Sequence, residues 1–408
     1  MKKLLAPLAF LAAFAMPAMA GPQEFNHINA GYYQAVLGDC QGCHTRPGGE
    51  PYAGGEPLDT PFGKIVPPNI TPDSETGIGN WTEAEFRSAL KDGIGKGGKH
   101  LYPAMPYPAY SKMTDKDISD LWAYMQTLKP VHRAVRANLL PFPFNIRLAM
   151  KGWNWINFKP QPFKADPSKS DEWNHGAYIV TGAGHCGTCH TPKSVLGADK
   201  DSEALMGASL AGWVAPNITN DKRAGIGNWS QEDIVTYLKT GRNAHSVASG
   251  PMAEAVENST SKMSDADLKA IAVYLSDRAP SSQPIQPTAV SASDPHMKAG
   301  QAIYQVNCSA CHSGDGKGEG QMFPPLAGNA IVMQADPETL AHVTLAGTQA
   351  ASTSGAPTAP AMPSFAWRLN DREVADVLTY VRNSWGNAAA PVAADAVRKV
   401  RTALHGGS

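Results

Sequence analysis

The chain has 408 residues, a formal net charge of −1 and 42% hydrophobic residues. This length exceeds one domain and suits about three, and the lack of a basic excess argues against nucleic-acid binding. The 38 glycines, the 33 prolines and a charged fraction of only 17% predict short helices joined by long, turn-rich loops.

Residues 1–20 have the pattern of a secretory signal peptide. Two lysines follow the first methionine, an apolar run occupies 4–15, and small residues at 18–20 form a cleavage site. We therefore expect an exported protein. An uncleaved anchor is the alternative, but this run is shorter than a spanning helix, and no later stretch reaches about 18 uninterrupted apolar residues.

All six cysteines belong to three copies of the motif Cys-x-x-Cys-His. The copies comprise Cys40, Cys43 and His44, then Cys186, Cys189 and His190, and finally Cys308, Cys311 and His312. This spacing is the attachment signature of c-type haem, in which two thiols bond the porphyrin and the histidine ligates its iron. A zinc half-site or a redox dithiol is the alternative for one copy, but a zinc site would need further Cys or His at close spacing. Three copies without a leftover cysteine predict three covalently bound haem c groups.

The chain repeats one order of elements around each motif: short helix, motif, long loop and closing helix. The loop segments at 67–81 (PPNITPDSETGIGNW) and 215–229 (APNITNDKRAGIGNW) are near-copies, which favours repeat elements over glycosylation sites for their Asn-Ile-Thr sequences. Closing helices are expected after Thr114, Ser264 and Asn370, each with a start that resembles a capping box. Each carries a tyrosine that we assign to core packing, namely Tyr124, Tyr274 and Tyr380. The short opening helix is expected to pack on the closing helix of its own unit.

This repeat predicts an all-α chain of three tandem class I cytochrome c-like domains with long Pro/Gly-rich loops. The expected divisions are a signal peptide at 1–20, a first domain at 25–134, an aromatic linker at 135–169, a second domain at 170–280, a linker at 281–293, a third domain at 294–388 and a tail at 389–408.

The second iron ligand of each haem is expected to be a methionine, which suits electron transfer because it raises the reduction potential. Met105, Met252 and Met362 lie 61, 62 and 50 residues after their motif histidines, each in a proline-containing loop. The flanks of Met252 match the other two less well. The competing methionines are Met113, Met263, Met206, Met322 and Met333, of which the first two fit core packing better. The motif histidines are expected to donate their other ring N–H to carbonyls of the turns at Pro67-Pro68, Pro216 and Pro324-Pro325.

Two further segments stand out. Residues 139–158 of the first linker are apolar and aromatic with few charges. They either pack between the first two units or contact another subunit or the membrane surface. The tail has apolar residues at 397, 400 and 404, so it is either a short membrane-surface helix or, as we favour, a frayed solvated helix. The Gly-rich segment at 93–98 fits a helix end and loop better than a dinucleotide site.

Taken together, the three motifs, the NIT…GIGNW segments, HLYPAMPYP at 100–108 and GHCGTCHTP at 184–192 resemble the triple-haem cytochrome c subunit of membrane-associated bacterial dehydrogenases. That family serves alcohol, gluconate, sorbitol, fructose and FAD-glucose dehydrogenases. The resemblance implies a separate large subunit, possibly with a small one, that oxidises an alcohol, sugar, sugar acid or aldehyde through flavin, PQQ or molybdenum. This chain would pass the electrons to ubiquinone or a terminal oxidase, in the periplasm or on the periplasmic face of the inner membrane.

The chain shows no residues that would oxidise an organic substrate by themselves, so no catalytic residue is expected. Some members of the resembled family end in a longer amphipathic anchor, and the brief tail here favours a soluble or loosely attached dehydrogenase. Two rival functions are a multihaem enzyme such as a peroxidase, which needs an open iron site, and a freely diffusing electron carrier without a dedicated dehydrogenase.

Overall fold

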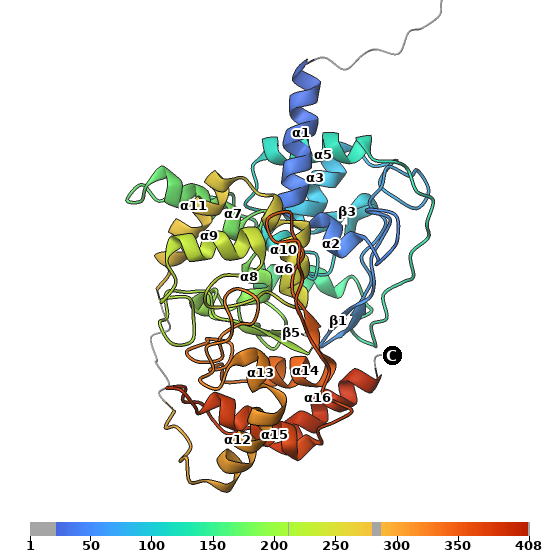
Figure 1. Ribbon diagram of the computed structural model, residues 1–408. Helices are drawn as coiled ribbons and strands as arrows, with labels where there is room; N and C mark the ends of the chain where they lie inside the picture. The colour runs from blue at the N-terminus through green and yellow to red at the C-terminus, as the bar shows by residue number, and fades with distance from the viewer. Residues whose placement is uncertain (1–21, 211, 280–286, 407–408) are drawn as a thin grey trace, which may run out of the picture.

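The computed structural model describes residues 22–210, 212–279 and 287–406. The predicted signal peptide lies outside the described residues, and so do residues 281–286 of the linker at 281–293. The described chain is built from short helices and four small antiparallel strand pairs (Figure 1). This agrees with the predicted all-α class.

An opening helix, a helical turn at the motif, a middle helix and a closing helix recur in this order three times along the chain. The first unit contains α1 (Pro22–Leu37), α2 (Cys40–His44), β1 (Leu58–Thr60), β2 (Gly63–Ile65), α3 (Glu83–Asp92), β3 (Ile94–Gly95), η1 (Lys96–Gly98), β4 (Lys99–His100), α4 (Tyr107–Tyr110) and α5 (Asp115–Thr127). After the linker helix α6 (Ala149–Asn157), the second unit contains α7 (Asp171–Thr181), α8 (Gly187–His190), η2 (Asp201–Glu203), β5 (Ala208–Leu210), β6 (Trp213–Ala215), α9 (Gln231–Thr240), α10 (Pro251–Asn258), η3 (Thr260–Lys262) and α11 (Asp265–Ser276). The third contains α12 (Pro295–Asn307), α13 (Ser309–His312), α14 (Glu338–Ala346), β7 (Thr348–Gln349), β8 (Ala361–Met362), α15 (Asp371–Arg382) and α16 (Ala394–Gly406).

In every unit the opening helix crosses the closing helix at a glycine. A Cβ added to Gly31 of α1 would lie 1.9 Å from the backbone oxygen of Asp120 in α5. The corresponding distances are 2.0 Å from Gly176 to the Ala270 oxygen and 2.1 Å from Gly300 to the Asp376 oxygen. Only a residue without a side chain permits this approach. The expected pairing of opening and closing helices is therefore confirmed in all three units.

The closing helices begin at the predicted caps, but two of them lack the reciprocal half of a capping box. The side chains of Thr114 and Ser264 accept hydrogen bonds from the third backbone N–H of α5 and α11, yet only Asn370 of the third unit forms the complete box. In the first two units the acid at the third position has other partners. Asp117 accepts a hydrogen bond from Tyr178 of the second unit, and Asp267 accepts one from Tyr33 of the first.

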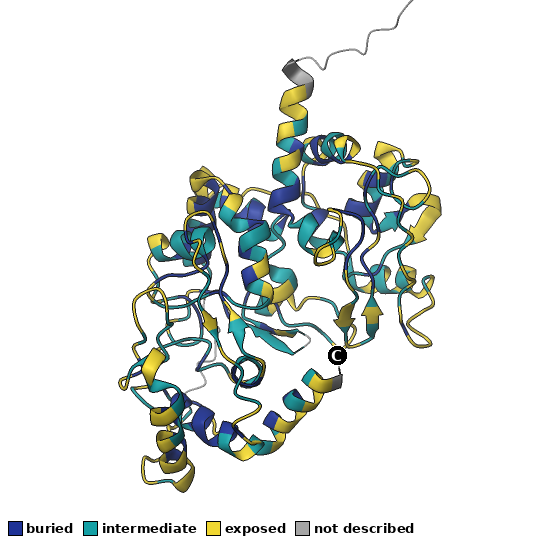
Figure 2. Cartoon of the chain, turned by 45° about the vertical axis from the view of Figure 1, so that its right-hand side comes forward, coloured by how far each residue is buried: buried dark blue, intermediate teal, exposed yellow. Residues whose placement is uncertain are grey.

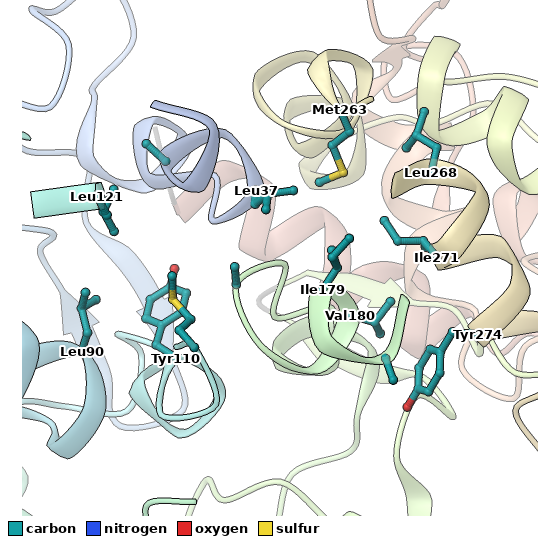
Figure 3. Packing of buried hydrophobic residues seen from close by; sticks show 14 of the residues in the cluster. Leu37, Leu90, Tyr110, Leu121, Ile179, Val180, Met263, Leu268, Ile271 and Tyr274 are labelled. Carbon is teal, nitrogen blue, oxygen red and sulfur yellow. The ribbon is translucent and has the colours of Figure 1, made fainter. Parts of the chain in front are cut away.

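These reciprocal tyrosine contacts join the first two units, which also share one hydrophobic core. Leu37, Leu90 and Tyr110 from the first unit belong to the same buried cluster as Ile179 and Ile271 from the second. Figure 3 shows the two groups facing each other across the interface. The third unit has a separate buried cluster. In Figure 2 the described part of α1 is exposed at 25–27 and buried at 35–37, where it meets the rest of the first unit.

The three repeated tyrosines differ in their burial. Tyr274 is 5% exposed and belongs to the shared core, as expected. Tyr124 and Tyr380 are half-buried and pack at the edges of their clusters.

The C-terminal helix α16 corrects the expectation of a frayed or membrane-bound tail. Val397 is fully buried and Val400 is 7% exposed in the core of the third unit. Arg401 fixes the helix by donating to Asp371 at 2.6 Å and to the backbone oxygens of Ala366 and Leu369. An amphipathic pattern predicts that one face of a helix packs against an apolar surface. For α16 that surface is the core of the third unit and not a lipid bilayer.

Candidate haem sites

Each Cys-x-x-Cys-His motif lies on a single helical turn that directly follows or closely follows an opening helix. The turns are α2, α8 and α13. On one turn, residues three and four apart share a face, so each pair of thiols and the histidine point to the same side. In the first unit the turn is capped by Asp39, which has a left-handed backbone (φ 42°) and accepts a hydrogen bond from the Gly42 N–H.

The motif histidines make the hydrogen bonds that the sequence predicts. The Nδ1 atom of His44 lies 2.7 Å from the Pro68 oxygen, that of His190 lies 2.7 Å from the Pro216 oxygen, and that of His312 lies 3.0 Å from the Pro324 oxygen. A carbonyl only accepts, so each Nδ1 carries the proton and each Nε2 keeps its lone pair for a metal.

The same surroundings keep these rings neutral. Burial lowers the pKa of His44, His190 and His312, and the hydrogen bond to the proline carbonyl opposes this lowering only in part. A neutral imidazole with a fixed tautomer is the form that binds iron.

The six cysteines form no disulfide. Burial raises the pKa of Cys40 and Cys186 to about 12 and that of Cys308 to about 11. A redox dithiol or a zinc site depends on thiolate, which a lowered pKa provides. In addition, the described ranges contain no cluster of three or more His, Cys, Asp or Glu that could hold a metal ion. The raised pKa values of these thiols favour neither alternative to haem attachment.

A cavity of about 520 Å³ runs beside the second and third motifs. The motif residues that line it are Cys186, Cys189 and His190 from the second unit and Cys308, Cys311 and His312 from the third. Much of the remaining lining is aliphatic or aromatic, including Ile179 and Leu275 of the second unit and Leu340 and Val377 of the third. An apolar cavity that presents two thiols and an imidazole from each side fits porphyrin groups attached at both motifs.

Two of the three predicted methionine ligands line this cavity. Met252 of the second unit and Met362 of the third are both among its lining residues. The expectation of a loop is wrong for both, because Met252 is in the first turn of α10 after Pro251, and Met362 is in the short strand β8. Proline suits the first position of a helix, because its missing N–H needs no partner there and its φ angle is already helical. The backbone of Met252 is therefore fixed by a regular helix instead of a loop.

The other methionines divide as follows. Met105 lies in the turn before α4, where its backbone N–H bonds the Tyr102 oxygen at 3.0 Å, and its role as a ligand stays a prediction. Met113 and Met263 are 2% and 3% exposed in the shared core, as expected. Met322 also lines the cavity but is 47% exposed.

The structure adds contacts between the first and second motifs that sequence reasoning missed. His185, next to Cys186, places its Nε2 atom 3.1 Å from the Gly38 oxygen, two residues before Cys40. Burial, the Asp39 carboxyl and then the nearby Cys189 thiol raise the pKa of Cys43 to about 11. The only signal for this contact in the sequence is that His185 directly precedes a motif.

One-turn helices that present two thiols and a neutral histidine, two of them beside one apolar cavity, define a c-type cytochrome on this mainly helical chain. Consistent with this, the family model for cytochrome c matches residues 30–129 and 297–385. The chain is 40% identical to the fructose dehydrogenase cytochrome subunit of Gluconobacter japonicus, over 92% of this chain and 82% of that protein. It is also 40% identical to the cytochrome c subunit of alcohol dehydrogenase (quinone) from Gluconobacter oxydans, covering 98% and 87% of the two chains. A third relative, the gluconate 2-dehydrogenase cytochrome c subunit of Pantoea cypripedii, is 39% identical over 98% of this chain and 95% of its own. The chain belongs to this family of dehydrogenase cytochrome c subunits.

Proposed function

We propose that the chain is an exported, periplasmic subunit that carries three haem c groups and relays electrons from a dehydrogenase to ubiquinone or a terminal oxidase. Cys40 and Cys43, Cys186 and Cys189, and Cys308 and Cys311 would attach the haems. His44, His190 and His312 would ligate the irons from one side, and Met105, Met252 and Met362 from the other. When bound, haem c supplies reversible one-electron chemistry at iron.

The observation that carries this proposal is that the three motifs are neighbours in sequence order. His185, directly before the second motif, hydrogen-bonds Gly38, two residues before the first, and the second and third motifs line one cavity. Neighbouring motifs suit a chain of haems that pass electrons from one to the next. An enzyme that acts by itself needs only one haem. The residues themselves hold the imidazoles in one tautomer, exclude water with apolar side chains and keep the methionines in place.

The dehydrogenase partner is proposed from the relatives, whose names cover a sugar, an alcohol and a sugar acid. These relatives are about equally identical to this chain, although the substrates in their names differ. We therefore expect the catalytic subunit, and not this chain, to determine the substrate. A flavin, PQQ or molybdenum enzyme that oxidises an alcohol, sugar, sugar acid or aldehyde would fit equally.

The test uses the haem-loaded chain co-expressed with a candidate dehydrogenase subunit. Substrate should reduce all three haems, judged by the absorbance of the reduced bands, and ubiquinone should reoxidise them. Substrate oxidation that proceeds at the same rate without this chain, or haems that stay oxidised, would contradict the relay.

The rival function of a haem peroxidase makes a different spectroscopic prediction. It requires an iron whose sixth ligand is missing or displaced, so the resting ferric protein would show a high-spin haem. A wholly low-spin spectrum supports the relay with three methionine ligands.

A further inference from the structure

The linker between the first two units exposes an unusual amount of apolar surface. Seven of the fifteen large apolar side chains that are exposed within the described residues fall in residues 139–156. Phe142, Leu148, Trp155 and Ile156 are 79%, 71%, 83% and 64% exposed. Exposed apolar groups gathered in one short stretch mark an interaction surface, whereas scattered single ones do not.

Other residues of this segment attach it to the first unit. Tyr107 of the first unit bonds Asn154 of α6 at 2.6 Å, and its ring meets that of Phe158. Earlier in the linker, Tyr102 donates to the Phe144 oxygen at 2.9 Å. The exposed side chains are thus presented by a docked segment, with α6 lying against the first unit.

A hairpin of the second unit extends the same surface. The backbone N–H of Ser194 bonds the Ala198 oxygen at 2.7 Å, which leaves Val195 and Leu196 at the tip, 93% and 51% exposed. The indole N–H of Trp153 in α6 donates to the Leu196 oxygen at 2.8 Å, so the hairpin and the helix are neighbours. Two segments far apart in the sequence therefore contribute to one apolar surface.

The charge of this linker is one-sided. Residues 135–165 contain five basic residues and no acidic one, in a chain whose net charge is −1. Arg136, Lys151, Lys159 and Lys164 are exposed, and none of the five forms an ion pair with another described residue. These basic side chains lie in the same segment as exposed aromatic and aliphatic ones. This combination is complementary to a surface that has negatively charged groups on the outside and an apolar layer below them.

We propose that residues 139–156, together with Val195 and Leu196, lie on the surface of a bilayer that contains anionic lipid. Short amphipathic helices bind membranes in the interface plane, with Trp, Phe and Leu in the headgroup boundary and basic residues near the lipid charges. No helix among the described residues is long and apolar enough to cross a membrane. The apolar face of the C-terminal helix is already buried in the third unit, so this helix does not offer such a contact.

The charge also distinguishes a membrane from a protein partner. Lysine is depleted where proteins meet each other, and three of the four exposed basic residues here are lysines. A lipid surface attracts lysine without requiring a matching carboxylate at each position. This assignment is independent of the electron relay, since it can be tested without any dehydrogenase.

The experiment is co-sedimentation of the haem-loaded chain with vesicles. We expect binding to vesicles of equal parts phosphatidylcholine and phosphatidylglycerol and little binding to phosphatidylcholine alone. The variant Phe142→Ser/Trp155→Ser/Ile156→Ser should lose binding to the mixed vesicles. The variant Lys151→Gln/Lys159→Gln should bind them about fivefold more weakly for each lysine removed, by the usual effect of one basic residue near an anionic surface.

The matched control is Val306→Ser/Trp367→Ser in the third unit, where the two side chains are 72% and 78% exposed outside the proposed surface. This control should bind like the unchanged chain. Equal binding of the linker variant and the unchanged chain, or no binding to either vesicle, would overturn the proposal. Unchanged vesicle binding combined with loss of dehydrogenase co-purification would assign the surface to a protein partner instead.

Discussion

The Nε2 atom of His185 donates a hydrogen bond to the backbone oxygen of Gly38, at 3.1 Å. The hydroxyl of Tyr110 donates to the same oxygen at 3.2 Å, and its ring meets the imidazole edge-on with centroids 5.5 Å apart. These three groups fix the residue before the second motif against the residues before the first. This contact therefore helps to set the relative position of the two predicted haems, together with the core that the two units share.

Replacement of His185 should loosen this contact. We expect His185→Phe, which keeps an aromatic ring but removes the donor, to lower the free energy of unfolding by about 1 kcal/mol. It should also slow electron exchange between the first two haems while both stay low-spin. Denaturant unfolding and flash reduction measure the two effects. An exchange rate equal to that of the unchanged chain would show that this contact is structural only.

The pair of His27 and Asp120 predicts a loss of stability in acid. The two side chains lie 2.5 Å apart, and that of Asp120 is 1% exposed. Burial by itself raises the pKa of Asp120, but hydrogen bonds from Lys116 and His27 outweigh it, so the net pKa is lowered. A carboxyl with a lowered folded pKa stabilises the fold above its unfolded value near 4 and loses this contribution as the pH falls below it.

The variant Asp120→Asn should therefore lower the free energy of unfolding at pH 7 by about 1–3 kcal/mol and flatten its decline in acid. The control is Asp395→Asn, which removes an exposed partner of Arg398 and should change stability by less than about 0.5 kcal/mol. Urea unfolding between pH 3 and pH 7 measures both. A decline in acid that is as steep in Asp120→Asn as in the unchanged chain would show that other groups are responsible.

The close approach of the opening and closing helices at a glycine predicts that a Gly→Ala substitution there destabilises the fold. Gly31→Ala would place a Cβ 1.9 Å from the Asp120 oxygen, so α1 and α5 must separate. We expect a loss of about 1–3 kcal/mol. Gly152→Ala in α6 is the matched control, because nothing lies within 4 Å of the added atom, and alanine there should stabilise the helix by up to about 1 kcal/mol. Equal melting temperatures for the two variants would contradict the close crossing.

The position of Met252 in the cavity predicts its effect on one haem. Met252→Ala should remove the weak near-infrared methionine–iron band of that haem and lower its potential. Met322→Ala, at a half-exposed position of the same cavity, should leave the spectrum intact. An unchanged band in Met252→Ala would mean that another methionine binds this iron.

The sequence predicted the features that depend on local patterns. Cap residues located the starts of α5, α11 and α15, and prolines after the motifs located the histidine partners. The sequence did not predict the helical turns that the motifs form. It did not predict that the first two units share a core, or that Val397 is buried by the third unit. Those outcomes depend on which surfaces meet after folding, and a helical stripe of apolar residues does not identify its neighbour.

The helix that holds Met252 illustrates the same limit at the site. Proline beside a methionine is compatible both with a stiff loop and with the first turn of a helix. The residues around Met105 and Met362 have a second proline directly after the methionine, whereas Met252 is followed by Ala253. The absence of a second proline after Met252, together with Ala253 and Glu254 at the next two positions, is the local signal that could have indicated α10.

The most direct measurement is the intact mass of the exported, denatured chain together with its alkaline pyridine spectrum. The account predicts a mass that corresponds to residues 21–408 plus three covalently attached haems, one for each of the three motifs. A chain that carries no covalent haem, or fewer than three when haem is abundant, would contradict it.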